Sequence, residues 1–156
     1  MNQSLALREL NTIEEMLTTF PVLAFEYPSM TKEAYEKMLR EMIPANYAQV
    51  GVFENGKCLG VSGYWVNTKL WCGRYLELDN IVVLETERSR GIGKMLMTSL
   101  NAVAEKRQCN MLALDSYTTN FKAHKLFYNL GFVPRGFHFI KFLSDSDTDA
   151  NGYRVK

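Results

Sequence analysis

Residues 77–100 read ELDNIVVLETERSRGIGKMLMTSL, and this stretch decides most of the fold expected for the chain. Acidic and apolar residues alternate at its start, as in a strand, and apolar residues recur at helical spacing after the two glycines. Glycines there let the backbone approach a ligand closely, because no Cβ stands in the way. A helix that begins at this point directs unpaired N–H groups and the positive end of its dipole outward, which suits an anion. We therefore predict a phosphate-binding turn between a strand and a helix.

Length and composition indicate one ordinary globular domain. The chain has 156 residues, of which 47% are hydrophobic and 22% charged, and its formal net charge is +1. That charge gives no general attraction to nucleic acid or to an anionic membrane. No run approaches the roughly 20 apolar residues of a membrane span, and the first residues do not read as a signal peptide. We expect a cytoplasmic protein with its domain in residues 1–143 and a polar tail in residues 144–156.

The three cysteines are widely spaced and form no C-x-x-C pair. This pattern favours neither a disulfide framework nor a zinc site, and it is typical of a reducing compartment. We expect no metal.

Before the opening stretch, the pattern predicts two helices and three strands. Thr12, or Asn11, is expected to cap a first helix that Pro21 ends, and Thr31 to cap a second helix that Pro44 closes. Asn55-Gly56 is a strong hairpin signal. The expected strands are 4–9, 48–54 and 57–66, with irregular segments at 21–30 and 67–75.

After the opening stretch, the chain predicts a strand–helix–strand crossover followed by another helix. Met111 to Asp115 is short and apolar, as in a buried strand parallel to the opening one. A helix should begin at Asn120 and stop at Gly131. Segments 132–135 and 137–143 are expected to complete the sheet. The predicted class is α/β (α+β), a mixed sheet with helices on both faces.

A glycine-rich turn between strand and helix occurs in several kinds of protein. The phosphate loop of nucleotide hydrolases requires G-x-x-x-x-G-K-[ST], but the glycines here are only two apart and Met95 follows Lys94. A dinucleotide-binding fold requires G-x-G-x-x-G early in the chain, whereas this turn comes late. A plain tight turn with no ligand is the remaining alternative.

The wider pattern resembles the GNAT superfamily of N-acetyltransferases. Arg88-Ser89-Arg90-Gly91-Ile92-Gly93 is similar to the family signature [RQ]-x-x-G-x-[GA]. Asn120-x-x-Ala123, followed by Gly131-Phe132, is similar to its second block. The resemblance covers roughly residues 5–143. It implies a mostly antiparallel sheet with a splayed parallel strand pair, and an acyltransferase whose acyl donor is acetyl-CoA.

The resemblance also implies coenzyme-binding roles for particular residues. The backbone from Arg88 to Lys94 would hold the pyrophosphate, and the strand Ile81-Val82-Val83 would pair with the pantetheine arm. The N–H of Val83 would be a candidate oxyanion donor. The expected coenzyme-binding residues are Ile81, Val82, Val83, Arg88, Ser89, Arg90, Gly91, Ile92, Gly93, Lys94, Asn120, Ala123 and Phe127.

Acetyl transfer to an amine requires a group that takes a proton from the amine. Glu77 falls where some family members place a catalytic glutamate, and Asp79 lies two residues nearer the thioester. In a regular strand, side chains alternate, so one face would carry Glu77, Asp79, Ile81 and Val83. A bulge could move either acid to the other face. We prefer Asp79 as the base or amine-binding group.

The departing thiolate can take a proton from a general acid, often a tyrosine in this family. Phe127 takes that tyrosine's usual place, and Tyr128 follows it, about 100° further round the helix. Either Tyr128 serves as the acid, or the thiolate leaves unassisted, since a thiol of pKa about 8.5 is a fair leaving group.

The sequence thus predicts an N-acetyltransferase that acts on a primary amine by direct attack. The acceptor would be a small molecule or a peptide, with a homodimer as one possible assembly. Two alternatives stay open: a coenzyme-binding sensor with little turnover, and transfer to protein lysines or N-termini.

Overall fold

The computed structural model describes residues 4–143. The chain folds as two compact units, divided between Ala113 and Leu114. The organisation as a single domain stays a prediction, and the polar tail lies outside the described residues. Among the residues described, no helix is both long enough and apolar enough to cross a membrane.

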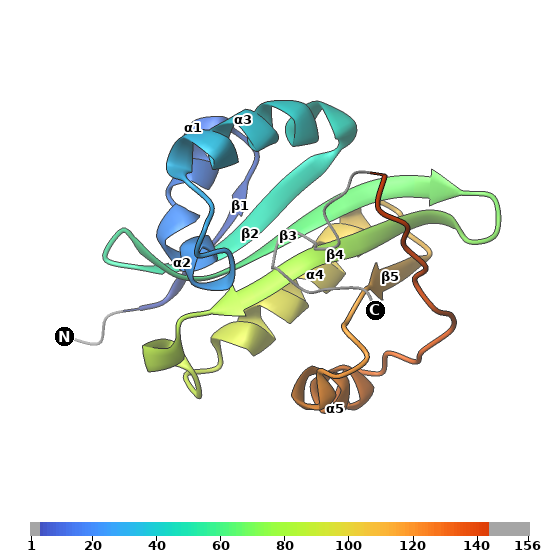
Figure 1. The fold of residues 1–156 in the computed structure, drawn as a ribbon. Helices are drawn as coiled ribbons and strands as arrows, with labels where there is room; N and C mark the ends of the chain where they lie inside the picture. The colour runs from blue at the N-terminus through green and yellow to red at the C-terminus, as the bar shows by residue number, and fades with distance from the viewer. Residues whose placement is uncertain (1–3, 144–156) are drawn as a thin grey trace. The chain divides into compact units, whose positions relative to one another are not determined.

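The first unit is built on a five-stranded sheet in the order β1-β2-β3-β4-β5 (Figure 1). The strands are β1 (Ala6–Leu10), β2 (Tyr47–Glu54), β3 (Lys57–Lys69), β4 (Gly73–Val83) and β5 (Met111–Leu114). The first four pair antiparallel with their neighbours, and β5 runs parallel to β4. The predicted mixed, mostly antiparallel sheet with one parallel pair is therefore confirmed.

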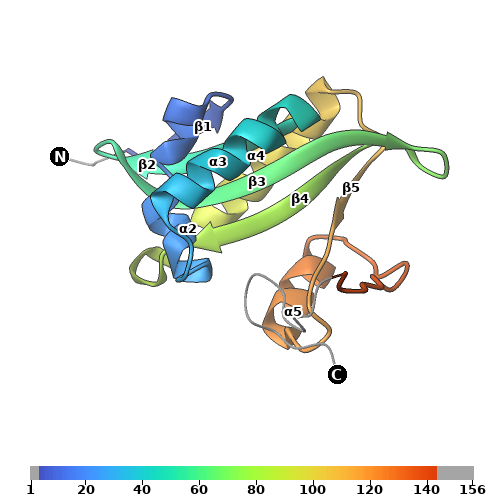
Figure 2. The same ribbon diagram turned by 45° about the horizontal axis from the view of Figure 1, so that its top comes forward.

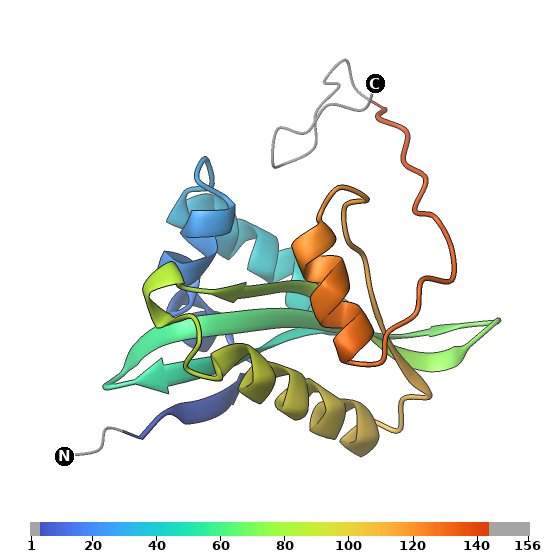
Figure 3. The same ribbon diagram turned by 90° about the horizontal axis from the view of Figure 1, so that it is seen from below.

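Helices cover both faces of this sheet, as Figures 1 and 2 show. One face carries α1 (Ile13–Leu17), α2 (Phe20–Glu26) and α3 (Lys32–Met42), which a 3-10 turn (Ile43–Ala45) follows. The other face carries α4 (Ile92–Lys106) (Figure 3). The buried side chains of α4 recur at the helical spacing expected from the sequence: Ile92, Leu96, Met97, Leu100, Val103 and Ala104.

The predicted helix caps are confirmed in the early helices. Thr12 forms a capping box with Glu15, and the Thr31 hydroxyl accepts a hydrogen bond from the Ala34 N–H at 3.1 Å. The prediction that Pro21 ends a helix and begins an irregular segment is wrong. Pro21 lies in the first turn of α2, where the N–H that proline lacks would have no helical partner.

Two hairpins join the central strands. Asn55 and Gly56 have φ values of 53° and 78°, as the tight turn between β2 and β3 requires. The loop expected at 67–75 is wrong, because β3 and β4 continue their pairing to Lys69 and Gly73. Residues 68–71 and 74 are exposed, and no regular alternation of apolar and polar residues marks this end of the hairpin as strand.

The second unit contains α5 (Phe121–Asn129) and the segment after it. The helix begins and ends where predicted, since the Asn120 side chain accepts from the Ala123 N–H at 3.3 Å and Gly131 has a φ of 86°. The strands predicted at 132–135 and 137–143 are wrong, because the segment 132–143 forms no strand. Pro134 lacks an N–H for strand pairing, and Gly136 weakens a strand. These two residues outweigh the aromatic residues of this segment, Phe137 and Phe139, which alternate as in a strand.

Candidate active site

A β-bulge in β4 shapes the acidic part of the candidate site. Gly63 of β3 pairs with Asn80 while the next residue, Tyr64, pairs with Leu78, so Asp79 is the extra residue. The Asn80 side-chain oxygen accepts the Gly63 N–H at 3.2 Å and thus replaces a bond that the ladder would otherwise supply. The Ser62 hydroxyl donates to the Asn80 carbonyl at 2.6 Å. Bulges of this kind redirect side chains and often lie beside active sites.

The bulge corrects the expectation for a regular strand. Before it, Glu77 pairs with Trp65 and shares the face of α2 and α3. After it, Val83 faces α4: a Cβ placed on its partner Gly60 would lie 3.3 Å from a Val83 methyl and 2.7 Å from an Ile92 methyl. The four residues expected on one face are therefore divided into Glu77 and Asp79 on one side and Ile81 and Val83 on the other.

The carboxyl group of Asp79 has a perturbed pKa. Desolvation by the surrounding atoms raises the pKa above its usual range, and the negative charge of Glu77 raises it further. A hydrogen bond from the Trp65 indole acts in the opposite direction. Asp79 as a whole residue is nevertheless exposed at the bulge. A carboxylate whose pKa is raised toward neutrality is a better general base, which favours Asp79 for that role.

The N–H of Val83 points toward the open side of β4. The next N–H, that of Leu84, donates to the Leu59 carbonyl of β3 at 3.0 Å. Because successive N–H groups of a strand point to opposite sides, the Val83 N–H points away from β3. On that side β5 has only four residues and starts next to Arg74, where the Asn110 N–H donates to the Arg74 carbonyl at 2.7 Å. Among the described residues of the first unit, no strand pairs with the end of β4 on that side, so Val83 presents a backbone donor there.

The turn between β4 and α4 presents a row of unpaired donors. Figure 3 shows the chain leave β4, make a short 3-10 turn (Glu85–Glu87) and enter α4. Ser89 and Gly91 have φ values of 69° and 80°. The first hydrogen bond of α4 runs from the Met95 N–H to the Gly91 carbonyl at 3.0 Å. Among residues 4–143, the six N–H groups from Ser89 to Lys94 have no acceptor, so this turn is a ready anion-binding site.

The glycines of this turn leave open space in front of these donors. A Cβ at Gly93 would meet no atom within 4 Å, and the residue does not have the positive φ that requires glycine. Alanine would therefore suit the protein alone better, since glycine costs up to about 1 kcal/mol in a helix. A ligand that approaches the backbone explains why glycine is useful here.

The basic side chains of the turn divide into bound and free groups. The Arg90 guanidinium pairs with Glu54, at the end of β2, at 2.7 Å, and also with Glu87. This hydrogen bonding lowers the pKa of Glu54. Arg88 pairs with Glu85 at 3.1 Å, whereas Lys94 is exposed and forms no ion pair with a described residue. Arg90 thus anchors the turn to the end of β2, and its contact with a phosphate stays a prediction.

The remaining predicted residues lie in the second unit, on or next to α5. Asn120 caps the helix and Ala123 supplies the capped N–H. The ring of Phe127 packs edge-on against Phe132, with their centroids 6.0 Å apart. Tyr128 is 58% exposed. Its position leaves the hydroxyl accessible within this unit.

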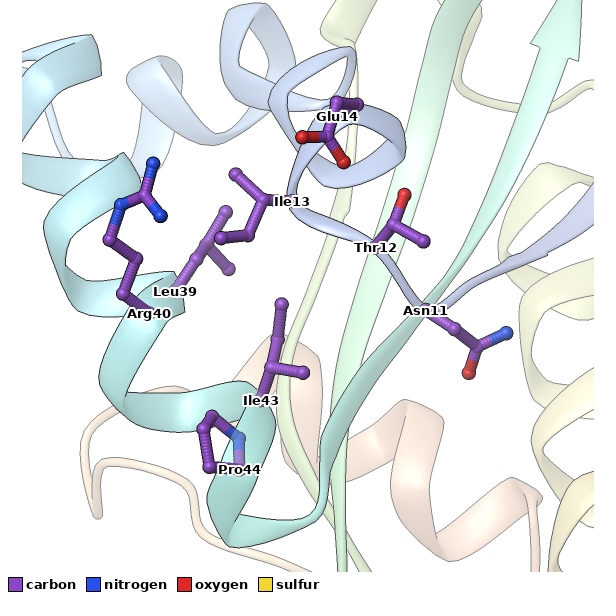
Figure 4. A pocket seen from close by; sticks show the side chains of 8 residues that line it. All are labelled: Asn11, Thr12, Ile13, Glu14, Leu39, Arg40, Ile43 and Pro44. Atoms are coloured by element: carbon purple, nitrogen blue, oxygen red, sulfur yellow. The ribbon is translucent and has the colours of Figure 1, made fainter.

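Among residues 4–143, open hollows on the first unit include two next to its helices. One has a volume of about 360 Å³ and lies between the start of α1 and the end of α3. Figure 4 shows Ile13, Leu39 and Ile43 pointing into it. No predicted site residue lines it. The other, of about 460 Å³, is lined by Leu7, Gly91, Lys94, Met95, Thr98, Ser99 and Ala102. It begins at the turn and continues along α4. No group of three or more potential metal ligands is found among residues 4–143.

Sequence reasoning missed three contributors to this site. Asn80 supports the bulge, Glu54 anchors Arg90, and Trp65 contacts the carboxyl group of Asp79. An asparagine inside an apolar strand is unusual and could have indicated the bulge. The other two depend on strand register and carry no local signal.

Comparison with known proteins identifies the family. The model of the acetyltransferase (GNAT) family matches residues 10–132. The chain belongs to this family. A relative described as the uncharacterized N-acetyltransferase YhdJ of Bacillus subtilis (strain 168) is 23% identical over 137 residues, covering 86% of this chain and 96% of that protein.

Solved structures of acetyltransferases share the fold. An aminoglycoside N-acetyltransferase, AAC(6')-Iy, in complex with CoA has a TM-score of 0.77 at 19% identity, covering 94% of this chain and 98% of its own. A ribosomal-protein-alanine N-acetyltransferase from Brucella melitensis has a TM-score of 0.76 at 19% identity, and the match covers 90% of this chain and 100% of that chain. Family membership makes this chain an N-acetyltransferase, whereas these two neighbours differ in acceptor.

Proposed function

We propose that this protein transfers an acetyl group from acetyl-CoA to a primary amine by direct attack. The observation that carries the proposal is the row of six unpaired N–H groups from Ser89 to Lys94, with open space in front of Gly93. The pyrophosphate of the coenzyme fits a row of backbone donors at a helix start. The CoA complex of the similar aminoglycoside enzyme supports this assignment.

Each end of the reaction has a candidate group in the first unit. The neutral amine attacks the thioester carbonyl, so that a C–N bond forms and the C–S bond breaks. Asp79, or Glu77, takes the proton that the amine loses, directly or through a water. The Val83 N–H, at the end of β4, stabilises the negative charge that develops on the carbonyl oxygen.

The sulfur leaves as a thiolate or takes a proton from Tyr128. Replacement of Tyr128 by Phe decides between these routes. A loss of kcat of roughly 100-fold, typical of general acid catalysis, indicates the tyrosine, whereas an unchanged kcat indicates an unassisted thiolate. Asn120, Ala123 and Phe127 of the second unit stay predicted contacts of the coenzyme arm.

The acceptor is a small-molecule or peptide amine. Structural neighbours that act on an aminoglycoside and on a ribosomal protein have nearly the same TM-score, so the fold does not choose between these classes. A panel of polyamines, amino sugars and peptide N-termini, assayed for free thiol with acetyl-CoA, identifies the class.

A coenzyme sensor with little turnover is the second candidate. The observation that favours it is Phe127, which has no hydroxyl at the usual place of the family's tyrosine. A sensor binds acetyl-CoA tightly and releases no thiol with any amine of the panel. Amine-dependent release of thiol contradicts it.

A further inference from the structure

A buried polar network lies on the sheet face that carries α1 to α3. The Gln49 amide nitrogen is 2.8 Å from the Tyr35 hydroxyl and 2.9 Å from the Tyr47 hydroxyl, while the Thr19 hydroxyl donates to the Gln49 side-chain oxygen at 3.0 Å. Gln49 and Thr19 are fully buried, and Tyr47 is 4% exposed. Both polar atoms of the Gln49 side chain therefore have hydrogen-bond partners, and the amide fixes the positions of both tyrosine hydroxyls.

Tyr47 extends this network to the bulge. Its hydroxyl lies over Gly63, where an added Cβ would overlap it, and Gly63 is the residue that pairs with Asn80 at the bulge. Its ring packs on that of Trp65, with the centroids 4.9 Å apart and an interplanar angle of 55°. Tyr47 thus holds the indole against the bulge.

Trp65 in turn lies next to the acidic pair. It pairs with Glu77 across the strands, and Asp79 is two residues further along on the same face. Diagonal neighbours of this kind are within reach of a long aromatic side chain. The indole nitrogen is a donor only, and its interaction with the Asp79 carboxyl group lowers the pKa of that group, in opposition to burial.

We propose that Trp65 is a positioning residue for Asp79: its indole N–H, braced by Tyr47 and Gln49, holds the carboxylate toward the acceptor amine. This inference rests on the proposed function for its role in catalysis. The contact itself is independent of any activity. Charged or titratable groups that act nearby are Glu77 on β4, Tyr47 on β2 and Tyr27 after α2; Lys69 on β3 acts through Glu77.

The contact can be tested without activity, because the chain has only two tryptophans. Trp71 is 68% exposed in the turn between β3 and β4, so the Trp71→Phe variant leaves Trp65 as the one tryptophan, whose emission is excited selectively over that of the tyrosines. The expected result is a change in Trp65 emission with pH, as the carboxyl group ionises, that disappears when Asp79→Asn is added. Emission with the same pH dependence in both proteins overturns the contact.

The role in catalysis is tested with the pH dependence of kcat/KM. Loss of the indole donor raises the pKa of Asp79, so the acid limb of the profile should move to higher pH in Trp65→Phe. Below that limb kcat/KM should fall roughly tenfold, as expected for a lost hydrogen bond to a charged group. The KM for acetyl-CoA should not change, and Trp71→Phe is the matched control with the same chemical substitution.

An acid limb that stays in place in Trp65→Phe overturns the positioning role. If no amine of the panel is acetylated, the proposed function fails, and the catalytic role of Trp65 fails with it. The fluorescence titration still decides whether the contact exists, so the two failures are distinguishable.

Discussion

A single methyl group added at Gly93 should stabilise the fold and weaken coenzyme binding at the same time. In Gly93→Ala the new Cβ meets no protein atom within 4 Å, and the backbone is one that alanine adopts. The substitution therefore leaves the apo protein unstrained. The methyl group occupies the space through which a pyrophosphate would reach the backbone donors.

The two effects have different magnitudes. Alanine is better than glycine in a helix by at most about 1 kcal/mol, which corresponds to a rise in Tm of roughly 2–4 °C for a chain of this size. Displacement of the pyrophosphate removes at least one charge-assisted hydrogen bond, worth about 1.5–3 kcal/mol. The Kd for CoA should therefore increase roughly 10- to 150-fold.

Thermal unfolding of the apo protein and calorimetric titration with CoA measure the two effects. Asn101→Ala is the matched control: it also replaces a poorer helix former in α4, at an exposed position far from the first turn and outside the lining of the hollow. This control should gain about 0.5 kcal/mol and leave the Kd unchanged. A Gly93→Ala protein that binds CoA as the wild type does refutes the assignment of this turn to the pyrophosphate.

Three further substitutions test other parts of the site. Asp79→Asn should raise Tm at neutral pH, because the raised pKa of Asp79 means that its ionisation opposes folding. The gain in Tm over the wild type should grow as the pH rises above the ordinary aspartate pKa, and it should vanish in acid. Thermal scans across this pH range that show no such trend contradict this prediction. Asn80→Ala should lower the free energy of unfolding by about 1–3 kcal/mol, since it leaves the buried Gly63 N–H without its acceptor. Urea denaturation measures this change, and an unchanged midpoint would mean that the bulge does not need the asparagine. Glu54→Gln should weaken CoA binding severalfold by releasing Arg90, with stability altered by no more than about 1 kcal/mol; unchanged affinity in calorimetry argues against an anchoring role.

The parts of the fold that depend on local signals could be predicted from the sequence. Thr12 and Thr31 cap helices through hydrogen bonds to residues three positions away, and Asn55-Gly56 supplies the backbone angles of a tight hairpin. The buried stripe of α4 follows from helical spacing alone. The phosphate-binding turn was predictable for the same reason, because its glycines and the helix that follows are consecutive in the chain.

The parts that depend on strand register could not be predicted. The position of the bulge is set by how Gly63 pairs with β4, and it decides which face each residue after Asp79 occupies. Glu54 and Arg90 are 36 residues apart, so no local pattern connects them. In the same way, Trp65 reaches the acidic pair only because β3 and β4 are neighbours.

Proline signals were ambiguous for a physical reason. A proline disfavours the helical conformation of the residue before it, but it fits the first turn of a new helix. Pro21 does the second, so the chain turns at Thr18 and Thr19 and continues as α2. The sequence shows the discontinuity, but it does not show which side of the proline is helical.

Acetyl transfer measured on the purified protein tests the central claim most directly. Acetyl-CoA is mixed with a panel of primary amines, free thiol is followed over time, and the acetylated amine is identified by mass spectrometry. The account predicts thiol release that depends on the amine and is strongly reduced in Gly93→Ala at limiting acetyl-CoA. Tight binding of acetyl-CoA with no thiol release for any amine contradicts it.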